Sequence, residues 1–200
     1  GAATDGQLAA RGDAARFQGG FREIIEGVNA TLDAVVGPLG MAASYVDRIS
    51  KGDMPPKITD TYRGEFNAIR ENLNACIDAI QALIADTQGL VESATSGNLA
   101  QRADASRHQG DFRRIVEGVN ATLDAMVTPI TEAAAILARV AERDLTARME
   151  GNYRGDFARI KDSLNMAAAN LDEALEQVAT AVEQVASAAG QIGQGSQALA

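Results

Sequence analysis

The feature that most constrains the fold of this sequence is a repeated pair, a Phe followed eight residues later by an Asn. The pair occurs four times, at Phe21 and Asn29, Phe66 and Asn74, Phe112 and Asn120, and Phe157 and Asn165. Successive Phe residues lie 45, 46 and 45 positions apart, and residues 26–34 recur letter for letter 91 positions later, at 117–125. A fixed period in this range indicates an array of similar units. The longer period indicates that two kinds of unit alternate.

Apolar residues follow each Phe at steps of four and three, which is the spacing of a heptad seam. The first seam is Phe21, Ile25, Val28, Leu32, Val35, Leu39, Ala42, Val46 and Ile49. Similar series begin at the other three Phe residues, so the sequence predicts four long helices with a connector before each of the later three. Pro38 and Pro129 lie inside the first and third helices. A proline removes one helical hydrogen bond, so we expect a kink or a local break at each.

The composition favours a helical protein that binds neither nucleic acid nor anionic membrane. Only 4% of residues are aromatic and Ala is abundant, which favours helix over sheet. The net charge of −9 opposes binding to polyanions. Cys76 is the single cysteine, so no disulfide forms within the chain and a reducing compartment is expected. No run of about 18 apolar residues is apparent, so we expect no bilayer span and no direct membrane contact in this segment.

The length of the connectors predicts the topology. About 12 residues separate each helix from the next, whereas antiparallel neighbours need only roughly 2–8. A connector of this length can run back along the helix that precedes it, so that the next helix starts parallel to the first. Two parallel helices with one seam do not enclose a core. We therefore expect a homodimer that forms stacked parallel four-helix bundles in an all-α fold.

These features resemble the HAMP domain, the signal-relay module of bacterial receptors. The likeness rests on Pro38 or Pro129 in a first helix, on Gly52-Asp53-Met54 or Arg143-Asp144-Leu145 at the start of a connector, and on the Phe and Asn of a second helix. It implies a partial unit at 1–35 and full units at 36–83, 84–126 and 127–174. The usual Asp-Glu-x-Gly start of the second helix is replaced here by Arg63-Gly64-Glu65-Phe66 and its relatives, as in divergent poly-HAMP arrays.

Residues 175–200 resemble the first adaptation helix of methyl-accepting chemotaxis proteins, on the segments 185–192 and 195–200. This resemblance implies a coiled-coil signalling helix in a cytoplasmic segment of a chemoreceptor-like transducer. The receptor coupling protein and the histidine kinase would bind beyond Ala200, and Glu183 and Gln184 fit the loose pattern of methylation sites. Because the chain starts with Gly1 in mid-repeat, we expect an excised segment of a parent that is soluble or anchored in the inner membrane. The alternatives are the same array in a sensor histidine kinase, or a passive dimerising spacer.

The sequence offers no catalytic constellation, cofactor motif or metal-ligand spacing, so we expect no enzyme in this segment. His108 is the single histidine and is expected to lie exposed in a connector. The four Phe residues are predicted to pack in the core, or in addition to switch the bundle between two packings. The four Asn residues are predicted either to fix the register of the seam or to lie on the helix surface. With Pro38 and Pro129 they form the predicted set of signalling and packing residues.

Overall fold

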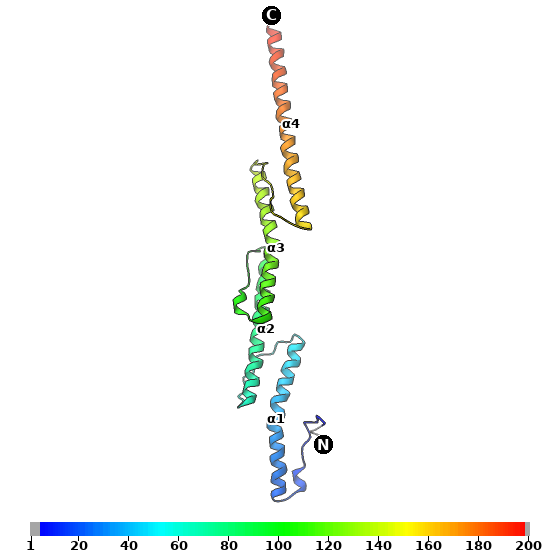
Figure 1. Ribbon diagram of the computed structural model, residues 1–200, viewed down its shortest axis with the longest axis vertical. Coiled ribbons are helices and arrows are strands. Elements are labelled where there is room, and N and C mark those ends of the chain that lie inside the picture. Colours follow the sequence, from blue (N-terminus) through cyan, green and yellow to red (C-terminus); the bar gives the residue numbers. More distant parts are fainter. Residues whose placement is uncertain (1–4, 199–200) are drawn as a thin grey trace. The chain divides into compact units, whose positions relative to one another are not determined.

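The computed structural model describes residues 5–198 and is all-helical over that range, with no strand among the described residues (Figure 1). It contains a 3-10 turn η1 (Ala14–Arg16), helices α1 (Gly20–Ser50) and α2 (Glu65–Thr95), a second turn η2 (Ala105–Arg107), and helices α3 (Gly110–Ala141) and α4 (Asp156–Ala198). The all-α prediction is confirmed. Residues 1–4 and 199–200, the outer ends of the first and last predicted units, lie outside the described residues.

The chain forms two compact bodies. The N-terminal body comprises Gly1–Thr95 and Ala103–Val116, and the C-terminal body comprises Ser96–Arg102 and Glu117–Ala200. Helix α3 begins in the first body and ends in the second. Each body contains a first helix, a connector that runs back along it, and a second helix in the same direction, as the long connectors predicted (Figure 1). We refer to the connectors as 51–64, 96–109 and 142–155.

The first helix of each body ends in the same hydrogen-bonded turn. After α1, the Asp53 N–H donates to the Arg48 carbonyl and the Gly52 N–H to the Ile49 carbonyl, both at 3.0 Å. This is a Schellman motif, which needs a left-handed residue at its fifth position, and Gly52 has φ 77°. Helix α3 ends in the same way at residues 139–144, but the left-handed position is held by Arg143, with φ 70°.

The core of the C-terminal body forms where the connector 142–155 packs on α3 and α4. Ile136 of α3 is buried together with Ala147 and Met149 of the connector. Half-buried residues surround them: Ala133, Val140, Tyr153 and Leu164. In the N-terminal body, Ile58 of the connector and Ile77 of α2 are buried in the corresponding way. The apolar connector residues therefore form much of the core that a single chain provides.

The two helix-internal prolines do not break their helices. Helix α1 continues through Pro38 and α3 continues through Pro129, each as one element, so the expected local break is wrong. A proline costs one hydrogen bond, but more than ten helical residues flank each proline on both sides. The buried ring of Pro129 also contributes apolar packing. The remaining hydrogen bonds and this packing keep the helices continuous.

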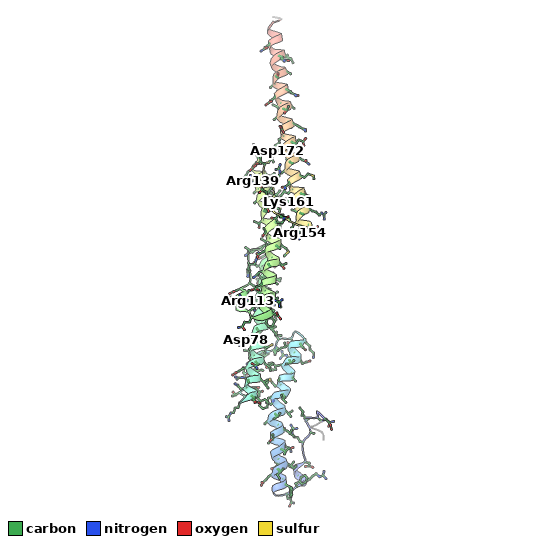
Figure 2. All side chains as sticks on the ribbon, viewed as in Figure 1. Asp78, Arg113, Arg139, Arg154, Lys161 and Asp172 are labelled. Carbon is green, nitrogen blue, oxygen red and sulfur yellow. The ribbon has the colours of Figure 1, made fainter. Side chains whose placement is uncertain are left out.

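Most of the apolar seam remains uncovered within one chain. None of the residues of α1 is buried, although its seam is apolar. The seam residues Val28, Val35 and Val46 are 52%, 38% and 55% exposed. Every residue from 169 to 192 in α4 is exposed, and Figure 2 shows the side chains beyond Asp172 projecting from a helix with no neighbouring element. Helix α3 is also long and apolar enough to cross a membrane by length and composition alone. That is weak evidence for a span, since helices that pack in a core pass the same test.

Candidate functional site

The repeated Asn side chains clasp the connectors. The Asn74 Oδ1 atom accepts from the Ile58 N–H at 2.7 Å, while its Nδ2 donates to the Ile58 carbonyl at 3.0 Å. Asn165 makes the same pair of bonds to Met149, at 2.8 and 3.0 Å. The amide group thus pairs with a connector residue as a neighbouring β-strand residue would. We call this two-bond arrangement the clasp.

A third clasp lies near the start of the chain. Asn29 accepts from the Gly12 N–H at 2.9 Å and donates to the Gly12 carbonyl at 2.8 Å. Gly12 has no side chain to bury, and a Cβ atom there would meet the Ile25 Cγ2 atom at 2.8 Å. Asn120, the fourth of the predicted set, holds the equivalent sequence position in α3 and is half-buried. The clasp role of Asn29, Asn74 and Asn165 differs from both alternatives that the sequence suggested, a seam residue and a surface residue.

The clasp fixes the connector where its apolar side chain enters the core. Ile58 is 5% exposed and Met149 is 1% exposed, so the backbone groups beside them have little access to water. Buried backbone groups need hydrogen-bond partners, and a side-chain amide offers both a donor and an acceptor. The clasp therefore ties the connector to the second helix at the point where the connector's apolar side chain is buried.

The connectors alternate in the ion pairs that hold them, in step with the period of 91 residues. The segment before α1 and the connector 96–109 each carry an Arg that reaches forward to the following helix: Arg11 Nη2 lies 2.6 Å from Asp33 Oδ1, and Arg102 Nη2 lies 2.7 Å from Asp124 Oδ1. The connectors 51–64 and 142–155 each carry an Asp that pairs with the preceding helix, Asp53 with Arg48 and Asp144 with Arg139. These pairs are the structural counterpart of the two kinds of unit seen in the sequence.

Asp144 is the best-defined acid at a connector start. It accepts from the Thr146 hydroxyl at 2.6 Å and from the Thr146 N–H at 3.1 Å, and it pairs with the Arg139 guanidinium. Two hydrogen bonds lower the pKa of Asp144 from 3.8 to about 2. The bond from the Thr146 hydroxyl has the larger effect, and the bond from Arg139 has the next largest. The ionised form of Asp144 therefore fixes the first turn of the connector 142–155.

The four Phe residues that are predicted to pack in the core differ in exposure in the single chain. Phe66 and Phe157 are half-buried, whereas Phe112 is 36% exposed and Phe21 is 73% exposed. The predicted role of these rings in a closed bundle stays a prediction. Glu183 and Gln184 are exposed on α4.

His108 does not lie exposed, contrary to the expectation from the sequence. It is 5% exposed, and its Nε2 atom lies 2.7 Å from Asp86 Oδ2 on α2. The sequence carries a signal that was missed: Phe17, Tyr62 and Tyr153 occupy the same position in the other repeats, so this position takes a ring. Among the described residues, no three His, Cys, Asp or Glu side chains gather where they could hold a metal ion.

The fold and the clasped connectors define a chain of helix–connector–helix units with parallel helices and an uncovered apolar seam. The HAMP domain family model matches residues 16–82 and 107–173, two ranges that are 91 residues apart. The chain therefore belongs to the HAMP domain family, whose members are signal-relay modules in transducers. A comparison with curated proteins found no match.

Proposed function

We propose that this chain is a non-enzymatic relay that passes a conformational signal through a homodimeric array of HAMP units toward a kinase-control region. The observation that carries the proposal is the seam of α1, where no residue is buried. Removing exposed apolar surface from water stabilises the buried state by about 25 cal/mol of free energy per Å². A second parallel copy would cover this seam and close each pair of helices into a four-helix bundle.

The proposed relay uses two packings of similar free energy in each bundle. A stimulus that favours one packing in a first unit shifts the next unit because a continuous helix is shared between them. Helix α2 serves as the second helix of one unit and leads into the next, and α3 does the same. The proposed units are 1–35, 36–83, 84–126 and 127–174, with Phe21, Phe66, Phe112 and Phe157 at the packing positions.

The output we propose is that of a chemoreceptor-like transducer. The support is the heptad spacing of the exposed residues Leu171, Leu175, Val178, Val182 and Val185 on α4, which suits a coiled coil, together with the likeness to a chemoreceptor adaptation helix. In this proposal Glu183 and Gln184 are methylation sites, and the coupling protein and kinase bind beyond Ala200. The array would act in the cytoplasm, as HAMP domains do in transducers.

Disulfide trapping tests the relay. In a Cys76→Ser background, which removes the exposed native thiol, single cysteines are placed at Phe66, Ile69, Leu73 and Ile77. Inter-subunit cross-linking is then measured in the parent receptor with its output locked on and locked off. We expect a different cross-linking profile in the two states. An identical profile would support a passive spacer, and a solution mass of one 20.9 kDa chain would exclude the dimer.

A further inference from the structure

A second contact holds the end of the connector 96–109, and its centre is an acid on the preceding helix. Asp86 of α2 lies 2.7 Å from the His108 Nε2 atom through one oxygen and 3.1 Å from the Arg107 Nη1 atom through the other. The His108 side chain is 2% exposed and that of Asp86 is 14% exposed. Hydrogen bonds to an ionised carboxylate are stronger than neutral ones. We call a contact of this kind an acid latch.

Glu132 of α3 forms an acid latch on the connector 142–155. One oxygen accepts from the Glu150 N–H at 2.7 Å and the Gly151 N–H at 3.2 Å, and the other accepts from the Tyr153 hydroxyl. The Tyr153 bond, then the Glu150 bond, lowers the pKa of Glu132, so the latch is ionised at neutral pH. Lys161 of α4 completes it by donating to the Glu150 and Gly151 carbonyls, at 3.2 and 2.9 Å.

The connector 51–64 has no acid latch. The position that Asp86 and Glu132 occupy is held in α1 by Met41, which precedes them by 45 and 91 residues. A thioether is at most a weak acceptor and carries no charge. An exposed ion pair does hold this connector, since Lys57 Nζ lies 2.7 Å from Asp78 Oδ2, with both side chains about half exposed. Exposed pairs of this kind contribute little to stability.

The partners for a latch are nevertheless present around this connector. Tyr62 and Arg70 precede Tyr153 and Lys161 by 91 residues each. The Nε atom of Arg70 is buried and has no hydrogen-bond partner among the described residues. Its Nη2 atom reaches only Glu71, at 3.4 Å. A buried donor without a partner is rare in folded proteins, and here it occurs at the sequence position that Lys161 holds near Glu132 in the later repeat.

We propose that the acid latches set the order in which the connectors release, and that the unlatched connector 51–64 is the one that detaches most readily. Detaching it costs the Asn74 clasp and the burial of Ile58. It also breaks the exposed pairs of Asp53 with Arg48 and of Lys57 with Asp78. Detaching the connector 96–109 or the connector 142–155 costs the charge-assisted bonds of Asp86 or Glu132, for which 51–64 has no counterpart. If the chain is a relay as proposed above, the unit at 36–83 changes its packing first. The release order itself does not depend on the relay.

Amide hydrogen exchange of the whole 200-residue chain, resolved by peptide, tests the release order directly. Three variants are compared with wild type, with circular dichroism as the check of folding. Asp86→Asn is expected to speed exchange in 103–109 about tenfold, as for loss of a hydrogen bond to a charged group. Glu132→Met, which imports the residue of the upstream repeat, speeds exchange in 145–153. Met41→Glu slows exchange in 57–63 severalfold.

The double variant Met41→Glu/Arg70→Met is the matched control, because it supplies the acid but removes the Arg70 guanidinium, whose Nε atom has no partner within the described range. It is expected to lose much of the protection gained by Met41→Glu alone. Unchanged or faster exchange in 57–63 of folded Met41→Glu overturns the proposal, as does a Glu132→Met effect spread evenly over the chain. If Met41→Glu fails to fold, Asp86→Asn and Glu132→Met still test the proposal. Exchange that is not faster in 103–109 of Asp86→Asn or in 145–153 of Glu132→Met overturns it. A confirmed release order combined with an identical cross-linking profile in both output states would refute the relay alone.

Discussion

Removing the amide of Asn74 should destabilise the chain by about 2 kcal/mol. Asn74→Ala removes both bonds to Ile58, at 2.7 and 3.0 Å. Each bond contributes about 0.5–1.5 kcal/mol. Because Ile58 is 5% exposed, its backbone groups cannot all regain water, and this places the loss in the upper part of the range. For a chain of this size, about 2 kcal/mol corresponds to a Tm lower by about 4–8 °C.

A second substitution separates the geometry of the clasp from simple loss of side-chain volume. Asn74→Asp keeps an acceptor for the Ile58 N–H, but it has no donor for the Ile58 carbonyl and brings a negative charge toward it. We therefore expect Asn74→Asp to be at least as destabilising as Asn74→Ala. The control is Asn67→Ala, since the Asn67 side chain donates to Glu71 at 2.8 Å in an exposed pair four residues apart. Such pairs contribute a few tenths of a kcal/mol.

Urea and thermal unfolding followed by far-UV circular dichroism measure these differences. Protein concentration must be fixed, because a dimer gains apparent stability by mass action. Asn165→Ala is expected to behave like Asn74→Ala, and the two losses should add, since the clasps share no partner. An Asn74→Ala variant within about 0.5 kcal/mol of wild type would refute the clasp as a stabilising element, and so would an Asn74→Asp variant with wild-type stability.

Two further predictions concern the start of the connector 142–155. Arg143→Gly should raise the free energy of unfolding by about 1 kcal/mol, because Arg143 has φ 70° where the upstream helix has Gly52; a lower Tm would contradict this. Asp144 has a folded pKa of about 2, below its ordinary 3.8. Its contribution is therefore complete above about pH 5 and is lost as the pH falls toward 2. Wild type should lose Tm more steeply than Asp144→Asn over this interval, and parallel acid titrations would refute the assignment.

The helices and connectors could be predicted from the sequence because their signals are local. The heptad steps after each Phe define the helices, and Gly52 with Pro55 and Pro56 ends the first one. The clasp could not be predicted in the same way. Its partner is a backbone group 16 or 17 residues earlier, and the clasped residues are Gly12, Ile58 and Met149, which share no side-chain chemistry. Only the nearly constant spacing from the connector to the Asn carried the signal.

His108 and Pro38 show two other limits of the sequence. A lone His in a connector is expected to be solvated, and its burial depends on Asp86, which lies 22 residues earlier on another element. A proline within a helical pattern is expected to interrupt it, yet α1 continues through Pro38. In both cases the local preference is overridden by contacts or by helical hydrogen bonds that form only in the folded chain.

The clasps recur from unit to unit, whereas the acid latches vary between units. This difference bears on how an array could transmit a signal. The described clasps at Asn29, Asn74 and Asn165 are alike, so they give the units one geometry. The latches at Asp86 and Glu132, and their absence at Met41, give each unit its own offset in free energy. Moving a two-state element from 1:99 to 99:1 takes about 5.5 kcal/mol. A hydrogen bond to a charged group contributes about 1.5–3 kcal/mol, so one or two of them are a large part of that difference. Substituting the acid at one helix position would therefore suffice to change which unit responds to a given stimulus, without any change in the fold.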